Sequence, residues 1–226
     1  MNNLNAPKLA AKSTLSDLVR THIQEGILQG NYVPGQRLKE SELASALGIS
    51  RSPIREAMKV LNEEGLISVE HWKGLRISKL NRLQMIELFT YREVLEGIAV
   101  ELACENIKPE LLGKLEDLVG DYLLSKDISL QDLSRNNQEF HQTIYEAAGN
   151  EYLLASTGTL RTLLALLPNE NFRLPGRTKV ILNEHRAIVD ALGKRDPAAA
   201  KKAMLEHVGN SLNAHVSLIV EADLGI

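Results

Sequence analysis

Two short amphipathic segments separated by a glycine-containing turn constrain the fold of this chain more than any other feature. The first segment covers residues 40–47, the turn is Gly48-Ile49-Ser50, and the second covers about residues 52–64 with Pro53 in its first turn. A proline there costs no hydrogen bond, because the first N–H groups of a helix have no partner within it. Two helices joined by a short turn with glycine are typical of a helix-turn-helix.

The flanking sequence extends this unit to a winged helix. Apolar residues at helical spacing predict a helix over residues 14–30, and Pro34-Gly35 marks a turn. Beyond the second helix, residues 66–69 and 75–77 are predicted strands on either side of the turn His71-Trp72-Lys73-Gly74. The sequence therefore predicts a small β-hairpin with a basic tip, which is the shape of a wing that touches DNA.

The second helix of the predicted helix-turn-helix begins with polar residues. Ser50, Arg51, Ser52 and Arg55 surround its N-terminus, and this is the part of a recognition helix that meets base edges in the major groove. Arginine can donate two hydrogen bonds to guanine, while serine hydroxyls and helix N-terminal amides can hold phosphates. A single arginine is more often a solvated surface residue, but the order helix, turn, helix, hairpin favours DNA binding.

Charge divides the chain into a basic and an acidic part. Residues 1–80 carry 11 Lys and Arg against 8 Asp and Glu, whereas residues 81–226 carry 15 against 21. The whole chain has 226 residues, which is enough for two domains of modest size. We therefore expect a flexible tail over residues 1–12, a DNA-binding domain over residues 13–79, and a second domain with different partners over residues 80–226.

Two further features bear on where the protein works. No apolar run approaches the length of a membrane span, and the N-terminal residues lack the apolar core of a secretory signal. Cys104 is the only cysteine, so no intramolecular disulfide can form, and such usage fits a reducing cytosol. We expect a cytoplasmic protein without a membrane partner.

Residues 80–226 show helical periodicity and no alternation typical of strands. Six helical segments are predicted, over about residues 81–106, 109–126, 129–148, 151–167, 177–194 and 196–222. The expected fold class is therefore mainly α. A winged helix-turn-helix with a small β-hairpin wing comes first, and an all-α bundle of six helices follows.

Several polar residues lie on the apolar, core-facing stripes of these predicted helices. Asn137 and His141 share one stripe, His185 and His207 lie on two others, and Arg92 lies on a fourth. Buried polar groups are costly without partners, so these side chains are expected to converge. Three imidazoles and one side-chain oxygen suit a divalent transition metal, with zinc expected and nickel or a similar ion as the alternative. Arg92 would then neutralise an acidic group of a bound ligand. On the pattern alone, three separately satisfied core histidines remain the alternative.

The first eighty residues resemble a known family. The strings Pro34-Gly35-x-Arg37-Leu38, Leu47-Gly48-Ile49-Ser50-Arg51-Ser52-Pro53-Ile54-Arg55-Glu56-Ala57 and Glu64-Gly65-Leu66-Ile67 resemble the DNA-binding domain of GntR-family bacterial regulators over residues 12–79. The resemblance implies a winged helix with DNA contacts at Arg37, Ser41, Ser50, Arg51, Ser52, Arg55, His71, Lys73 and Gly74. Ser41 departs from the FadR branch of the family, which has an arginine at this position.

The second part resembles the ligand-binding domain of the FadR subfamily, the type called FCD, over about residues 80–222. The matching strings are Asn137-x-x-Phe140-His141-x-x-Ile144-Tyr145, Glu184-His185-Arg186 and Met204-x-x-His207, and Arg92-x-x-Leu95-Glu96 fits its first helix. The resemblance implies metal ligands at Asn137, His141, His185 and His207. Many members have aspartate at position 137, and a neutral amide oxygen is a weaker ligand than a carboxylate.

Together these observations predict a ligand-responsive transcriptional regulator and not an enzyme. We expect a homodimer on a pseudo-palindromic DNA operator, with a small organic acid bound through the metal and Arg92. One alternative is the same regulator without a metal. The other is a helical metal-dependent hydrolase fused to a DNA-binding domain, which is disfavoured because Gln142 stands where the HExxH motif has its general base.

Overall fold

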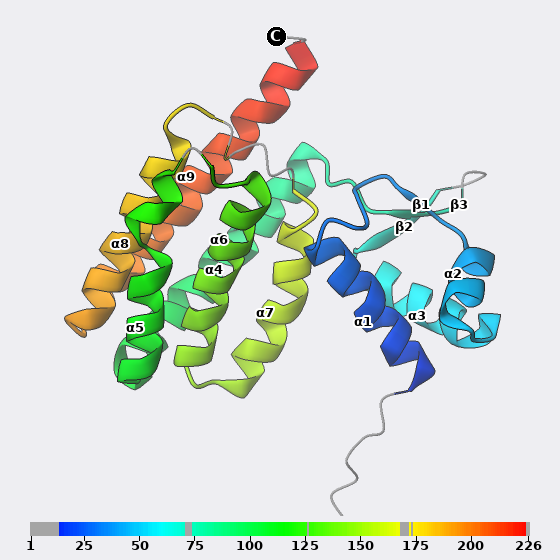
Figure 1. The fold of residues 1–226 in the computed structure, drawn as a ribbon, viewed down its shortest axis with the longest axis horizontal. Coiled ribbons are helices and arrows are strands. Elements are labelled where there is room, and N and C mark those ends of the chain that lie inside the picture. The colour runs from blue at the N-terminus through cyan, green and yellow to red at the C-terminus, as the bar shows by residue number, and fades with distance from the viewer. Residues whose placement is uncertain (1–13, 71–73, 126, 168–171, 173, 225–226) are drawn as a thin grey trace, which may run out of the picture. The chain divides into compact units, whose positions relative to one another are not determined.

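The computed structural model describes residues 14–70, 74–125, 127–167, 172 and 174–224, so the predicted tail over residues 1–12 lies outside it. The chain forms two compact units, which divide between Ser78 and Lys79 (Figure 1). The described part of the first unit contains three helices and a small sheet, and that of the second is helical. Each unit has its own core.

The first unit has the order helix, strand, helix, helix, strand, strand. Its elements are α1 (Leu15–Leu28), β1 (Arg37–Leu38), α2 (Glu40–Leu47), α3 (Arg51–Glu63), β2 (Ile67–Glu70) and β3 (Gly74–Ile77). Helix α1 begins with a capping box, in which the side chains of Thr14 and Asp17 each accept a hydrogen bond from the other's backbone N–H. Gly48 ends α2 in the left-handed conformation, with φ 67°, and so makes the turn into α3.

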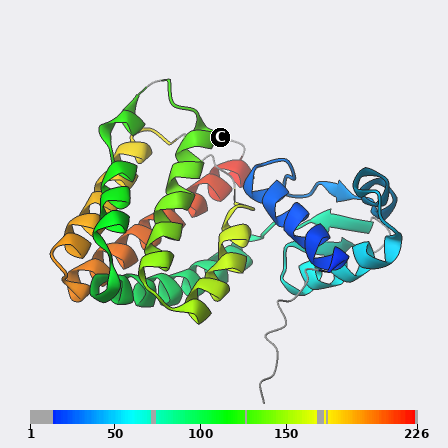
Figure 2. The same ribbon diagram turned by 60° about the horizontal axis from the view of Figure 1, so that its bottom comes forward.

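The sheet has three antiparallel strands in the order β1-β3-β2 (Figure 2). Ile67 pairs with Ile77 and Glu70 with Gly74, which confirms the predicted hairpin. The sequence analysis missed β1, whose Leu38 pairs with Leu75 of β3. A strand of two residues is too short to show an alternating pattern in the sequence. It is identified in the structure by its pairing with β3.

Apolar side chains from the helices and the wing form the core of the first unit. Ile23 of α1, Ile54 and Leu61 of α3, and Leu66 beside β2 are fully buried. Helix α3 packs against both α1 and α2. Its buried face leaves the N-terminal Arg51 and Arg55 exposed, so the packing presents the predicted recognition residues to solvent.

The second unit confirms the predicted helical bundle. Its elements are α4 (Arg82–Asn106), α5 (Pro109–Leu118), η1 (Asp121–Leu124), α6 (Leu130–Ala147), α7 (Glu151–Leu164), α8 (Arg177–Gly193) and α9 (Pro197–Leu224). Asn81 and Ser129 cap α4 and α6 as their side chains predict. Helix α5 ends at Leu118 and not near residue 126, because Gly120 disfavours continuation and the chain tightens into the 3₁₀ helix η1.

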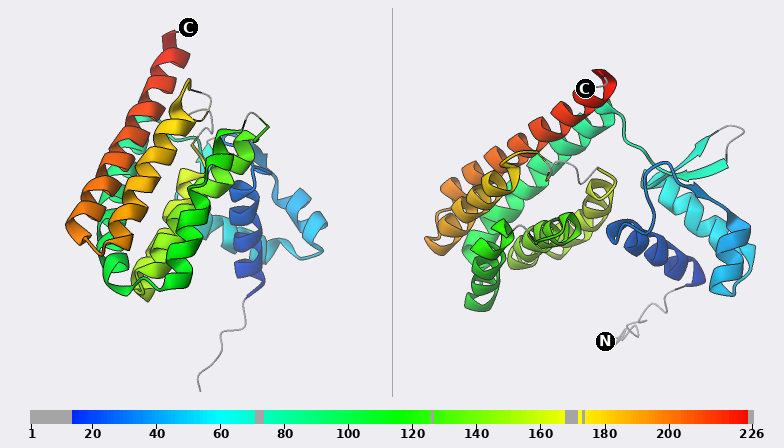
Figure 3. Two further views of the ribbon diagram at one scale, coloured as in Figure 1. Left: turned by 60° about the vertical axis from the view of Figure 1, so that its left-hand side comes forward. Right: turned by 45° about the horizontal axis from the view of Figure 1, so that its top comes forward.

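The long helices α4 and α9 pack against each other, α8 lies along α9, and α6 lies along α4 (Figure 3). Phe89, Phe140 and Met204 are fully buried in the core between them. This arrangement directs one face each of α4, α6, α8 and α9 into the same interior. Within the described residues, no helix has the length and apolar character needed to cross a membrane.

Candidate functional site

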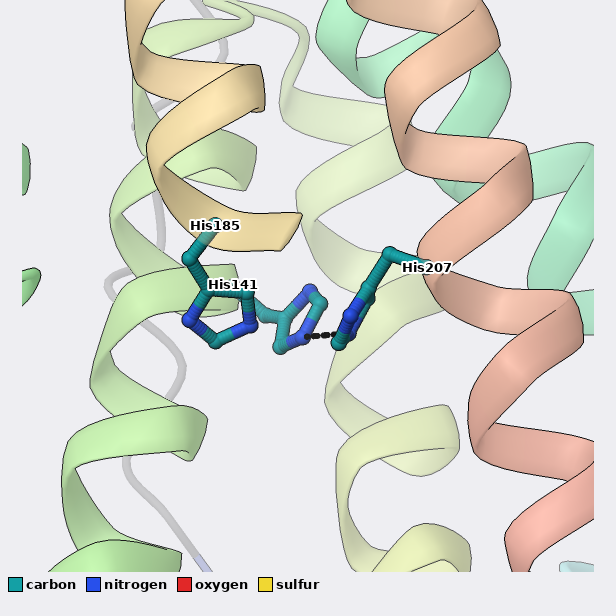
Figure 4. A group of neighbouring side chains, drawn as sticks. All are labelled: His141, His185 and His207. Carbon is teal, nitrogen blue, oxygen red and sulfur yellow. Dashed lines mark hydrogen bonds between the residues drawn. The ribbon is translucent and has the colours of Figure 1, made fainter. Parts of the chain in front are cut away.

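Three histidines from three helices meet inside the second unit. His141 of α6, His185 of α8 and His207 of α9 are 5%, 2% and 2% exposed. One ring nitrogen of each lies within 4.8 Å of the corresponding nitrogens of the other two, and Figure 4 shows the three rings turned toward a common point. The structure thus brings together three of the four residues predicted to hold a metal.

The hydrogen-bond partners of His141 and His207 assign their tautomers. Nδ1 of His207 lies 2.8 Å from a carboxylate oxygen of Glu184, which can only accept, so Nδ1 carries the proton. A guanidinium nitrogen of Arg92, which can only donate, lies 2.9 Å from Nε2 of His141. Both Nε2 atoms are therefore acceptors, and they lie 3.2 Å apart. The lone pair of His141 accepts the hydrogen bond from Arg92, and His141 would exchange this bond for a metal. Two acceptor nitrogens at this distance favour a shared cation over direct contact with each other.

His185 offers a third nitrogen. Its ring stacks on Phe140, with ring centroids 3.8 Å apart and planes 4° from parallel. Its Nε2 is buried and has no hydrogen-bond partner. A buried polar atom without a partner lowers the stability of the folded state, so the unpartnered Nε2 of His185 needs an explanation. A cation bound by the three rings would supply the missing partner.

Burial keeps all three imidazoles neutral at physiological pH. It lowers the pKa of His207 to about 4, since desolvation outweighs the hydrogen bond to Glu184 that acts in the other direction. Burial also lowers the pKa of His141, with Arg92 adding to the effect and Glu96 opposing it. The pKa of His185 falls well below its ordinary value for the same reason, burial, reinforced by the neighbouring rings. Neutral imidazole is the form that ligates a metal.

These residues fit a divalent metal such as zinc or nickel. Two nitrogens held about 2.0–2.1 Å from one tetrahedral zinc ion lie about 3.3 Å apart, close to the 3.2 Å between Nε2 of His141 and Nε2 of His207. Asn137 lies one turn before His141 on α6, is partly exposed, and lines a cavity together with His141 and His207. Its amide oxygen remains the predicted fourth ligand.

Two buried or part-buried carboxylates lie beside the outer nitrogens of the histidine rings. Glu96 of α4 is fully buried and accepts hydrogen bonds from Arg92 at 2.8 Å and from the hydroxyl of Tyr145 at 2.6 Å. Its second oxygen lies 3.2 Å from Nδ1 of His141. Burial by itself raises the pKa of Glu96, but Arg92 and His141 together hold it well below its usual range. Glu184 accepts a hydrogen bond from Nδ1 of His207 and is paired with Arg177 at 3.0 Å.

A cavity of about 70 Å³ adjoins the histidines. Its wall includes Arg92, Ser134, Asn137, His141, Tyr145, Arg161, His207, Ser211 and His215, with apolar side chains from α7 and α8. Among the described residues, no aspartate or glutamate lines it. The cavity therefore combines donors and positive charge with neutral imidazoles, and it is suited to a small anion.

The structure exposes the predicted DNA contacts of the first unit. Arg37, Ser41, Ser50, Arg51, Ser52, Arg55 and Gly74 are all exposed, whereas His71 and Lys73 lie outside the described residues. Ser50 is the N-cap residue of α3, but its hydroxyl makes no capping hydrogen bond. Arg55 pairs with Glu40 of α2 at 2.9 Å. The start of α3 thus presents hydroxyls, backbone N–H groups and one unpaired arginine, Arg51, among the described contacts.

Four further residues at the site are not among those predicted from the sequence: Glu96, Glu184, Tyr145 and Arg161. A signal existed for Glu96, because it lies four residues after Arg92 and so on the same face of α4. Glu184 precedes His185 directly, which places it on a different face of α8, and that face meets His207 of α9. No local pattern shows which neighbouring helix such a face will meet.

Comparison with known proteins assigns a family to each unit. Residues 15–77 match the family described as bacterial regulatory proteins, gntR family, and residues 87–210 match the FCD domain. An uncharacterized HTH-type transcriptional regulator, YdhC of Bacillus subtilis, is 30% identical over 88% of this chain and 89% of its own length. A probable D-xylose utilization operon transcriptional repressor of Paenarthrobacter nicotinovorans is 30% identical over 92% and 91%. The solved structure of E. coli McbR/YncC shares the fold, with a TM-score of 0.76 and 21% identity over 91% of this chain and 99% of that one.

Proposed function

The chain belongs to the GntR family of bacterial transcriptional regulators, with an FCD domain behind its DNA-binding domain, and from this premise we propose how its DNA binding is controlled. Its relatives are regulators and not enzymes. We infer that a small organic acid, bound in the metal-containing cavity of the FCD domain, changes the affinity of the protein for its operator.

The convergence of His141, His185 and His207 carries this proposal. The three imidazoles are neutral, and each has one ring nitrogen that can donate an electron pair to a metal. Packing alone does not explain why one of these nitrogens has no hydrogen-bond partner and two others lie 3.2 Å apart. A metal held there would supply a Lewis-acidic position for a carboxylate of the effector. Asn137 would be the fourth protein ligand, and the neutral amide would leave more positive charge on the site than aspartate would.

The chain's own residues would orient the effector. Arg92 lines the cavity, and its Nε is held by Glu96. Its Nη2 donates to Nε2 of His141, and a metal on that nitrogen would release this N–H group for the acid. A guanidinium has five N–H donors, so others remain for an acid in the cavity. Tyr145 donates to Glu96 and thereby keeps that carboxylate from facing the acid. The acid would thus accept hydrogen bonds from Arg92, while the carboxylate of Glu96 keeps its hydrogen bonds from Arg92 and Tyr145.

We further propose that the protein acts as a homodimer on a pseudo-palindromic operator. Helix α4 exposes large apolar side chains at Leu83, Tyr91, Val94 and Ile98, which are 45–64% exposed. At 100° per residue these four fall within about 80° of one face of the helix. Such a face is typical of an interface between two copies, and a two-fold dimer would present two recognition helices to two half-sites.

Fluorescence anisotropy with a duplex operator tests the regulatory proposal. The operator is first selected from a random pool with the purified protein, and its affinity is then measured with and without zinc across a panel of short carboxylic acids. We expect at least one acid to change operator affinity, and only when zinc is present. The His141→Ala variant should keep its basal DNA affinity and lose this response. An unchanged response in that variant would remove the metal site from the mechanism.

A further inference from the structure

Arg161 of α7 places a positive charge at the cavity wall that no carboxylate among the described residues neutralises. Its side chain lines the cavity, and its Nη1 makes one long contact, 3.4 Å from the amide oxygen of Gln142. Its Nε is buried and has no hydrogen-bond partner. Buried donors without acceptors are rare in folded proteins, so the guanidinium of Arg161 calls for a partner.

The second arginine at the cavity, Arg92, differs in this respect. Its Nε donates to Glu96 at 2.8 Å, and the pair is almost completely buried. Its Nη2 donates to His141. Glu96 therefore balances the charge of Arg92, although N–H groups of Arg92 remain for the first carboxylate. No carboxylate among the described residues balances the charge of Arg161, which is left for a second anionic group.

The charged residues that line the cavity also indicate an anionic ligand. Burial raises the pKa of Tyr145 well above its ordinary value, while the positive charges of Arg92 and Arg161 act to lower it. The charge of Arg161 thus reaches the hydroxyl of Tyr145, which also lines the cavity. Since no aspartate or glutamate lines the described part of that wall, an anion is the natural counter-charge.

We propose that Arg161 binds a second anionic group of the effector and so selects acids with two anionic groups over acids with one. This rests on the proposed function, in which the first carboxylate lies at the metal. The cavity of about 70 Å³ has space for roughly five to seven water-sized groups at about 10–15 Å³ each. That is the size of a short dicarboxylate such as malonate.

The selectivity follows from the geometry of a guanidinium. Arginine can donate two parallel hydrogen bonds to one carboxylate, and such charge-assisted pairs are among the strong polar contacts. An acid with a single carboxylate would occupy the metal and leave Arg161 without its counter-charge. One satisfied charged hydrogen bond corresponds to a preference of about tenfold to a hundredfold.

Calorimetric titration of the zinc-loaded protein with malonate and propionate tests this inference. The two acids share a three-carbon chain and differ in the second carboxylate. We expect the wild type to bind malonate at least about tenfold more tightly. Arg161→Gln should bring the ratio close to one without weakening propionate binding, and Arg161→Lys should retain part of it. Arg135→Gln is the matched control, because Arg135 is an exposed arginine of α6 paired with Asp132, and it should keep the wild-type ratio.

Three results would overturn the inference. The first is an equal affinity of the wild type for the two acids, and the second is an unchanged ratio in Arg161→Gln. The third is a parallel loss of both acids together with a lowered melting temperature, which would assign Arg161 a structural role. If the wild type binds zinc and operator but neither acid, the proposed effector function fails as well, and this result differs from the other three.

Discussion

Glu184 accepts a hydrogen bond from Nδ1 of His207 at 2.8 Å, although it adjoins His185 in the chain. Consecutive residues of a helix point about 100° apart. As a result His185 stacks on Phe140 of α6 while Glu184 reaches α9. Arg177, which is also buried, holds the carboxylate from the other side at 3.0 Å. This pair fixes the ring of His207 so that its Nε2 faces His141.

The variant Glu184→Gln should bind the metal more weakly without unfolding. A neutral amide oxygen can still accept from Nδ1, but it lacks the negative charge that makes the histidine a stronger ligand. Loss of such an outer partner typically costs about 10–100-fold in metal affinity. A competition titration of zinc against a chromogenic chelator measures the change. Glu206→Gln, at an exposed position of α9, serves as the control. Equal zinc affinity in the Glu184→Gln variant and the control would contradict the assigned role.

The sequence predicts the metal site in part because helix periodicity is a local property. His141, His185 and His207 each stand out on an apolar stripe, and the bundle does bring these stripes together. The partners Glu96 and Glu184 depend on which helices meet, and that information is spread over the whole chain. Arg161 gives no signal in the sequence, because an arginine beside apolar residues on α7 resembles any surface arginine with a buried stem.

His215, a buried residue of the cavity wall, gives a second prediction. Burial lowers the pKa of His215 to about 4, with Arg92 and Arg177 adding to the effect. In the unfolded chain a histidine titrates near about 6.5. Below that pH the unfolded state binds a proton that His215 in the folded state does not bind. The contribution of His215 to the free energy of unfolding is therefore fully present above about pH 6.5 and decreases as the pH falls toward about 4. Each such histidine contributes up to about 1.4 kcal/mol per pH unit over this range.

His215→Leu should therefore make the unfolding free energy less dependent on pH. Urea denaturation in the presence of a chelator, at several pH values between about 7 and about 4.5, gives the slope for each protein. The three cluster histidines titrate in the same direction, so a slope should remain in the variant but be shallower. A variant whose slope equals that of the wild type would show that His215 is protonated as easily in the folded state as in the unfolded chain.

The start of α3 gives a prediction for DNA recognition. Arg51 is exposed and precedes the buried face of the helix, whereas Arg55 is engaged by Glu40 at 2.9 Å. If Arg51 contacts a guanine edge, Arg51→Ala should weaken specific binding by about 1–3 kcal/mol and relax the preference at one base pair of each half-site. Lys59→Ala is the matched control, since Lys59 lies later on α3 and pairs with Glu63. Anisotropy titrations with the selected operator and with point-substituted operators separate the two effects. A uniform loss across all of these duplexes would mean that Arg51 contacts phosphate and not a base.

The apolar face of α4 predicts the assembly state. Val94 is 58% exposed at the centre of this face, and a charge buried in an interface between two copies would be costly. Val94→Asp should therefore shift the protein from dimer toward monomer in sedimentation equilibrium, and weaken binding to the full operator far more than binding to a single half-site. Val180→Asp controls for the charge itself, because Val180 on α8 is 46% exposed and lies outside this face. If the Val94 variant remains as dimeric as the Val180 control, the two copies do not meet through α4.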